Sequence, residues 1–137
     1  MDLYVPQSST KGGLNMAFHR YLIEIGQGVD MHGGDNTKAA LKALQDATHH
    51  CCMAGVHEIF HFAPGDGNIQ VKADIYAPET DSIDTRPLYD YLGAYDTEIQ
   101  LHTGGASAPV LYMPQMGAGD HITIVLAALT VYVNSSN

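Results

Sequence analysis

Cysteine and basic residues are scarce in this chain, and a long apolar run is absent. The only cysteines are the neighbours Cys51 and Cys52, so a disulfide framework is excluded and we expect two free thiols in a reducing, cytoplasmic setting. Lysine and arginine total 6 against 15 aspartates and glutamates, and this net charge of −9 argues against nucleic acid or an anionic membrane surface as a partner. No run reaches the roughly 18 apolar residues of a membrane span, and the first residues lack the basic and apolar regions of a signal peptide.

The size of the chain predicts a single globular domain. Its 137 residues are 45% hydrophobic and 15% charged, which is enough apolar material for a core. We expect residues 1–15 to be a flexible leader and residues 16–137 to form one α+β domain.

Two kinds of hydrophobic pattern predict the fold. One helix is expected after a cap at Asp35 or Asn36, with a buried stripe that continues to Cys51, and a second over residues 84–93. Strands are expected over residues 20–26, 56–62, 68–78, 97–102, 110–114 and 121–133. The order β-α-β-β-α-β-β-β predicts a two-layer sandwich, in which a mostly antiparallel sheet carries two helices on one face.

The connection between the first strand and the first helix, "GQGVDMHGG", is rich in glycine. Glycine permits a positive φ and a close backbone approach. A dinucleotide fingerprint and a phosphate loop do not fit, because the third spaced glycine and the Gly-Lys-Ser/Thr ending are missing. We therefore expect this segment and the following helix start to bind a ligand through Gly26, Gly28, Gly33, Asp35 and Thr37.

Asp30 and His32 carry the chemistry of this segment. In an extended chain, residues two apart project from one side with a backbone spacing of roughly 6–7 Å. Asp30 would then orient His32 as a general base while Lys38 steadies an oxyanion. Alternatively, Asp30 and His32 hold a divalent metal ion together with His121. A third interpretation is structural: Asp30 bonds backbone amides in a tight turn, and His32 packs against the sheet.

A second glycine-rich segment resembles the first. "GAGDH", at residues 117–121, precedes the last strand and also carries an aspartate and a histidine. Asp120 and His121 are therefore the best additional donors if the two segments meet at one edge of the sheet. Ser107, in "GGASAP", is the one nucleophile candidate in a glycine-rich turn, and its simpler interpretation is a polar loop residue.

Gly26, Gly28, Asp30, His32 and Gly33 form the pattern G-x-G-x-D-x-H-G, which resembles the signature of a small conserved-hypothetical family, the Lin family. The resemblance extends over nearly the whole chain from about residue 16 and includes the helix start "DNTKAA". Because the function of that family is uncharacterised, the resemblance supports a site without assigning a reaction.

The chain is also loosely similar to ring-opening amidohydrolases that act on cyanuric acid and barbiturate. Those enzymes use serine–lysine pairs, for which Lys38 and Ser107 are the equivalents here, but their serine–glycine–glycine turn is absent from this sequence. The similarity implies hydrolase chemistry and domains that associate in threes with sites between subunits.

Two functions remain open at this point. The first is binding of a small polar molecule at the Gly26–Gly33 segment, with amidohydrolase-like hydrolysis as its enzymatic form. The alternative is a non-catalytic, self-assembling structural protein. In both cases we expect a homo-oligomer, a trimer or larger, because helices on one side would leave Tyr76 and its neighbours on an open, half-apolar sheet face.

Overall fold

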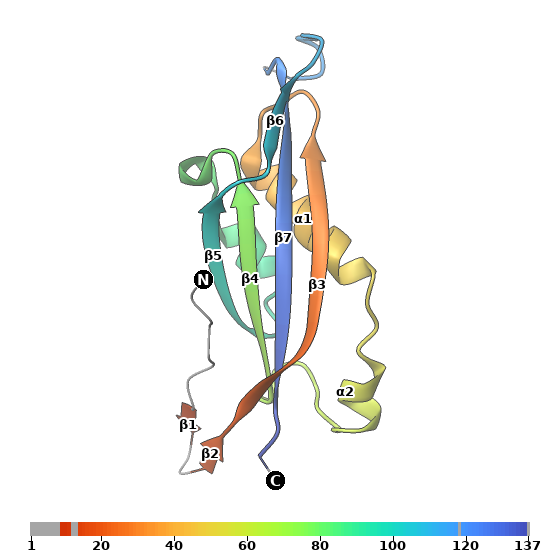
Figure 1. Cartoon of the computed structure of the whole chain (residues 1–137), viewed down its shortest axis with the longest axis vertical. Coiled ribbons are helices and arrows are strands. Elements are labelled where there is room, and N and C mark those ends of the chain that lie inside the picture. The colour runs from red at the N-terminus through yellow and green to blue at the C-terminus, as the bar shows by residue number, and fades with distance from the viewer. Residues whose placement is uncertain (1–8, 12–13, 118, 137) are drawn as a thin grey trace.

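The computed structural model describes residues 9–11, 14–117 and 119–136, and its centre is a five-stranded sheet. Four strands lie side by side in the order β3 (Phe18–Asp30), β7 (His121–Asn134), β4 (Ile69–Ala77) and β5 (Asp96–Thr103). A short fifth strand, β6 (Ala106–Pro109), pairs with the first residues of β7 past the end of β4 (Figure 1).

Helices cover one face of this sheet. They are α1 (Asn36–His49), α2 (Ala54–Glu58) and α3 (Arg86–Tyr91), with a 3-10 turn, η1 (Thr80–Ser82), between β4 and α3. In Figure 1, α1 and α3 lie behind the sheet and α2 lies beside its lower end. The predicted two-layer α+β architecture is therefore confirmed. No helix in the described part of the chain is long and apolar enough to cross a membrane.

Strand β7 is the centre of the sheet and pairs antiparallel with β3, β4 and β6. Strands β4 and β5 are parallel, which the sequence pattern did not indicate. Parallel neighbours need a crossover connection, and here the chain crosses through η1 and α3 on the helical face.

Two local predictions are wrong, and a third is incomplete. Residues 56–62, expected as a strand, fall in α2 and the turn after it, where the Gly55 carbonyl accepts the Ile59 amide at 2.9 Å. Short apolar runs do not distinguish a strand from a buried helical turn. Residues 110–114, also expected as a strand, form no regular strand. Conversely, the expected break at "GGASAP" contains β6, which β7 supplies with a pairing partner.

Helix α1 forms where the sequence places it. The Asp35 carboxylate caps it by accepting the Lys38 amide at 3.0 Å, as predicted. Its buried face consists mainly of alanine, which lets the helix axis approach the sheet closely. The helix ends at His49, so Cys51 lies in the following linker and does not extend the helical stripe as expected.

The outer edge of β3 is covered by side chains from α1. Asp46 accepts the Gln27 amide at 2.9 Å, and the Lys42 ammonium donates to the Val29 carbonyl at 3.0 Å. A long edge strand with free amides and carbonyls invites pairing with another chain. The two helix side chains therefore protect the part of this edge that adjoins the signature.

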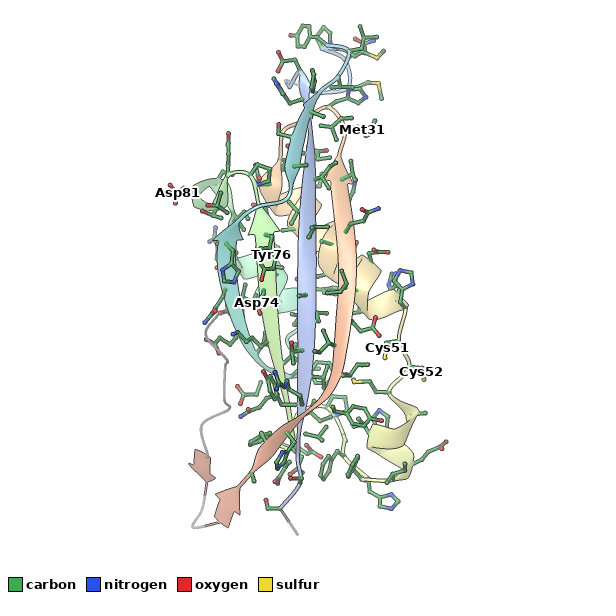
Figure 2. All side chains as sticks on the ribbon, in the orientation of Figure 1. Met31, Cys51, Cys52, Asp74, Tyr76 and Asp81 are labelled. Carbon is green, nitrogen blue, oxygen red and sulfur yellow. The ribbon has the colours of Figure 1, made fainter. Side chains whose placement is uncertain are left out.

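The other face of the sheet has no covering layer among the described residues. On β3 the side chains of Ile23 and Ile25 are 59% and 62% exposed, and on β7 Leu126 is 40% exposed. Tyr76 of β4 lies opposite Leu126 on this face and is labelled in Figure 2. The expected half-apolar open face is therefore present.

Part of the expected leader, residues 1–15, lies outside the described residues, namely positions 1–8, 12 and 13. Its described parts form a two-stranded antiparallel ribbon of β1 (Ser9–Lys11) and β2 (Leu14–Met16).

Candidate functional site

The first two glycines of the signature are packing positions in a strand. Gly26 and Gly28 lie within β3, and the positive φ in this segment belongs to Gly34. A Cβ on Gly26 would lie 2.3 Å from the carbonyl oxygen of Ala43, and one on Gly28 would lie 1.9 Å from that of Ala39. Both glycines thus let β3 touch the backbone of α1. The predicted close approach is made to the helix, and these two glycines do not turn the chain.

Asp30 fixes the connection between β3 and α1. The residue is 5% exposed, and its Oδ2 accepts the Asp35 amide at 2.9 Å. Lys38 lies 3.9 Å from Oδ1 with an ammonium that reaches into solvent, since 60% of its side chain is exposed. Gly33 packs beside the carboxylate, where a Cβ would lie 2.7 Å from Oδ2. These contacts agree with the structural interpretation of Asp30.

His32 is not oriented by Asp30. Strand β3 ends at Asp30 and the chain bends over residues 31–33, so the same-side spacing of an extended chain does not apply. No hydrogen bond joins the two side chains in the described part of the molecule, and the buried Nδ1 of His32 has no partner there. A role for His32 as a base therefore remains a prediction without its expected partner.

The two glycine-rich segments meet, as the sequence suggested. The Gly119 amide donates to the His32 carbonyl at 2.7 Å. Gly117 packs against the same carbonyl oxygen, which a Cβ at that position would approach to 2.7 Å. The segment that precedes β7 therefore lies directly on the signature.

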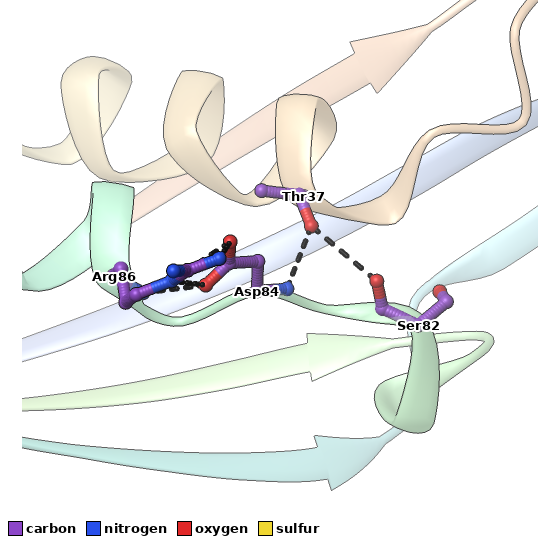
Figure 3. A network of polar contacts seen from close by, with 4 residues as sticks. All are labelled: Thr37, Ser82, Asp84 and Arg86. Carbon is purple, nitrogen blue, oxygen red and sulfur yellow. Dashed lines mark hydrogen bonds and ion pairs between the residues drawn. The ribbon is translucent and has the colours of Figure 1, made fainter.

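Thr37 links α1 to the crossover rather than presenting a free hydroxyl to a ligand. Its Oγ1 accepts the Asp84 amide at 2.9 Å and donates to the Ser82 carbonyl at 3.5 Å (Figure 3). Asp84 is itself paired with Arg86 at 2.7 Å. Thr37 thus holds the segment between η1 and α3 against the helix start.

A cleft of about 340 Å³ opens beside the junction of the two glycine-rich segments. We call it the signature cleft. Its lining comes from the start of α1, the end of β4, β6 and the start of β7: Gly34, Asn36, Pro78, Glu79, Ser107, Gly119, Asp120, His121 and Thr123. Of the predicted site residues, His121 lines it directly, whereas Asp30, Asp35 and Thr37 support the helix start at its wall.

Two buried polar side chains shape the signature cleft. Asn36 is 3% exposed; its Oδ1 accepts the Glu79 amide at 3.3 Å, which joins α1 to the end of β4. Thr123 is 4% exposed and stands opposite Ser107 in the pairing of β6 with β7. Directly opposed residues have Cβ atoms about 4.5–5.5 Å apart, so the side chains of Ser107 and Thr123 are neighbours on one face of the strand pair.

The signature cleft combines a hydroxyl, an imidazole and a carboxylate. Nδ1 of His121 is hydrogen-bonded to Oδ1 of Asp120. His121 lies two residues before Thr123 on the same side of β7, which makes it a diagonal neighbour of Ser107 across the strand pair. A carboxylate that holds an imidazole beside a hydroxyl is the arrangement used for nucleophilic acyl transfer.

The predicted metal ligands do not converge. Among the described residues, no group of three His, Cys, Asp or Glu side chains is placed to hold a metal ion. Asp30, His32 and His121 therefore do not form a metal-binding set.

Sequence reasoning missed Glu79 and Thr123 and considered Asn36 only as a helix cap. These residues are far apart in the sequence and come together through the register of β6 with β7 and the Asn36–Glu79 contact. The local signal for this contact was the two-residue spacing within each strand. Ser107 and Pro109 share one side of β6, and His121 and Thr123 share one side of β7.

The fold and the cleft define a small two-layer α+β protein with a glycine-packed strand and helix at its centre. A family model matches residues 20–131, and the chain belongs to that family, described as a conserved hypothetical protein family (Lin0512_fam). The resemblance to the Lin family is thereby confirmed.

The comparison with solved structures supports the fold. A crystal structure from Nostoc punctiforme, described as an FtsZ-like protein of unknown function, is 24% identical to this chain with a TM-score of 0.77. The match covers 88% of this chain and 100% of that chain. A search of the curated proteins found no match.

Proposed function

We propose that this protein binds a small polar molecule in the signature cleft. The observation that carries the proposal is the composition of this cleft. The hydroxyls of Ser107 and Thr123, the imidazole of His121 and the carboxylates of Glu79 and Asp120 all line one concavity of about 340 Å³. Ligand sites are concavities of this order that place a few polar groups around the bound molecule.

His32 provides a second observation, because its backbone carbonyl accepts the amide of Gly119, which lines the cleft. Its Nδ1 is buried without a partner among the described residues, and its carbonyl holds Gly119 of the cleft wall. A buried polar atom that makes no hydrogen bond costs about 1–3 kcal/mol. Such an atom calls for an explanation, and a functional role is one of those known in native structures.

The enzymatic form of this function is hydrolysis of an amide. Ser107 Oγ attacks the carbonyl carbon, and His121, held by Asp120, takes the hydroxyl proton and gives it to the leaving nitrogen as the C–N bond breaks. Water then releases the acyl group from Ser107. In this scheme His121 takes the role that the sequence suggested for His32.

Barbiturate and cyanuric acid, the ring compounds opened by the amidohydrolases that the chain loosely resembles, are the first probes. Isothermal titration should show binding of at least one of them to the wild-type protein, and ultraviolet absorbance should report any ring opening. Thr123→Val should weaken binding by about tenfold, the contribution of one well-placed hydrogen bond.

Thr130→Val is the matched control, because Thr130 lies on the same strand but on the open face. Its affinity should equal that of the wild type. The proposal is abandoned if neither ring compound nor a panel of small amides and ureas binds at millimolar concentration, or if the two variants lose affinity equally. Ser107→Ala should abolish turnover and retain binding if hydrolysis occurs.

We also propose that the chain self-associates through the open sheet face, as a trimer or larger. The exposed Ile23, Ile25 and Leu126 belong to the neighbouring strands β3 and β7 and form one apolar surface. Contiguous exposed apolar surface of this kind is typical of sites where proteins associate. Beside this apolar surface, β4 and β5 carry the polar side chains of Asp74 and His102, which are hydrogen-bonded to each other.

Sedimentation equilibrium tests self-association directly. The wild type should have a mass of at least three times the 14.7 kDa chain mass, and Ile25→Glu should reduce it towards one chain. Ile59→Glu is the control, since Ile59 is 71% exposed but lies after α2, off the sheet. A wild-type monomer at micromolar concentration would contradict this proposal and leave the ligand proposal unaffected.

A further inference from the structure

A second cleft lies at the other end of α1 from the signature cleft. It arises because α1 is much shorter than the central strand β7, which it covers. Strand β7 has 14 residues and spans about 46 Å at 3.3 Å per residue. Helix α1 also has 14 residues but spans only about 21 Å at 1.5 Å per residue. The helix therefore covers about half of the sheet, and the remaining half is covered by the linker, α2 and α3.

These shorter pieces leave a concavity of about 470 Å³, which we call the apolar cleft. Its floor is the sheet, at Val71, Leu129 and Val131, which are all more than 90% buried. One wall is the end of α3 with Tyr91 and Tyr95. The opposite wall is the end of α1 and the linker that carries the two cysteines labelled in Figure 2. Core side chains thus form the base of a ligand-sized opening.

Glu24 is the one carboxylate among the lining residues of this cleft, which are mainly apolar and include one imidazole, that of His57. Glu24 of β3 lines the cleft, and no lysine, arginine or histidine forms an ion pair with it among the described residues. Glu24 instead lies beside the Cys51 thiol. Burial first, and then a hydrogen bond to Glu24, raise the pKa of Cys51 above its ordinary value. A carboxylate in apolar surroundings gains from a positively charged hydrogen-bond donor.

The tyrosine wall suits the body of such a ligand. Tyr91 is held in place by a 2.6 Å hydrogen bond between its hydroxyl and Thr48 of α1. Its ring and that of Tyr95 then present fixed aromatic surface to the cleft. Aromatic faces pack well against apolar groups and attract cations.

We infer that the apolar cleft binds a small, mainly apolar amine, with its ammonium group at Glu24 and its apolar body between the sheet floor and the tyrosine wall. This site is separate from the signature cleft, which lies at the other end of α1 and has a polar lining. It thus adds a second ligand class to the proposed function.

A series of three probes with one body tests the inference on the wild-type protein. The probes are 2-phenylethylamine, 2-phenylethanol and 3-phenylpropionate, and binding is followed by NMR with a ¹⁵N-labelled protein. The amine should bind about tenfold more tightly than the neutral alcohol, as expected for a charge-assisted hydrogen bond. The carboxylate probe should bind least, and the shifted amides should include Leu129 and Val131. Equal affinity for the three probes, shifts confined to other regions, or no binding at millimolar concentration would overturn the inference.

Glu24→Gln provides the second test. This variant should lose the tenfold preference for the amine over the alcohol. Glu58→Gln, which removes the same charge from an exposed position outside the cleft, should keep the preference. Loss of the preference in both variants would show a general charge effect and would also overturn the inference. If Glu24→Gln does not fold, the probe series on the wild type still decides the matter.

Discussion

Gly28 of β3 lies directly against the backbone of Ala39 in α1. A Cβ added at Gly28 would lie 1.9 Å from the Ala39 carbonyl oxygen and 2.5 Å from the Ala43 amide nitrogen, and neither backbone atom can move aside without displacing the helix. The glycine therefore sets the distance between the two layers at the point where the signature begins.

Gly28→Ala should accordingly cost about 3 kcal/mol or more of unfolding free energy, the upper range for overpacking a rigid site. Urea denaturation measures the loss. Gly34→Ala is the comparison: Gly34 has a φ of 61° and nothing within 4 Å of its added Cβ, so it should lose only about 1–2 kcal/mol through backbone strain. A larger loss at Gly34 than at Gly28 would show that conformational freedom, rather than close packing, explains the signature.

A second prediction concerns the buried carboxylate at the end of β3. Asp30→Ala removes the acceptor of the Asp35 amide and should cost about 1–3 kcal/mol. Asp30→Asn retains an oxygen that can accept this amide, and it should cost clearly less. Urea denaturation of the two variants separates a hydrogen-bonding role from a role that needs the charge. If the asparagine variant is as unstable as the alanine variant, the charge at Asp30 is the important property.

The long patterned elements could be predicted from the sequence, and the close contacts could not. Helix α1 and strands β3, β4, β5 and β7 follow from periodicity over many residues, and so does the capping role of Asp35. The close packing of Gly28 against α1 could not be predicted. In a single sequence, a glycine that permits a turn cannot be distinguished from a glycine that lets a helix pack closely against a strand.

The candidate site could be predicted only in part, for a similar reason. The sequence placed it at the signature and named Ser107, Asp120 and His121 as outside contributors, and the structure lines one cleft with these three. The pairing of Asp30 with His32 assumed an extended chain, whereas the strand ends between them. The register of β6 with β7 brings Thr123 to Ser107, and that register depends on the whole sheet.

Asp46, the α1 side chain that accepts the Gln27 amide at the edge of β3, should make the stability of the protein depend on pH in the acid range. The hydrogen bond from the Gln27 amide, followed by that with His50, lowers the pKa of Asp46. A lowered folded-state pKa contributes stability above the ordinary value of an aspartate, near pH 4, and this contribution is lost as the pH falls through the folded-state value. Wild type should therefore exceed Asp46→Asn in stability at pH 7, and the difference should shrink at pH 3.

Urea midpoints at the two pH values provide the measurement. Asp81→Asn serves as the matched control, because Asp81 is exposed and has no hydrogen-bond or ion-pair partner in the part of the chain that the structure describes. Its midpoint should track that of the wild type at both pH values. A difference between wild type and Asp46→Asn that stays constant from pH 7 to pH 3 would contradict the role of the charge.

The adjacent cysteines should differ in reactivity. Cys52 is exposed, whereas Cys51 is partly buried and its pKa is raised by burial and by Glu24, so less of it is thiolate at neutral pH. With a disulfide reagent, Cys51→Ser, which retains Cys52, should react about tenfold faster than Cys52→Ser. The two rates should converge in denaturant. Equal, rapid labelling of both native variants would contradict the burial of Cys51.

His32 should be dispensable for folding and required for binding. The Nδ1 atom of its imidazole is buried and makes no hydrogen bond among the described residues, so its removal breaks no polar contact of the side chain. The contact that joins the two glycine-rich segments uses the His32 backbone carbonyl, which His32→Ala retains. This variant should therefore lose less than about 1 kcal/mol of stability.

The same variant should bind the ring-compound probes of the signature cleft at least about tenfold more weakly, because the unpaired Nδ1 would no longer be available to a bound molecule. Thermal denaturation and isothermal titration on one preparation measure both effects. A large fall in the unfolding temperature with unchanged affinity would show that His32 packs the turn and has no part in binding. That result would favour self-association as the function of the chain, since the signature would then serve the fold alone.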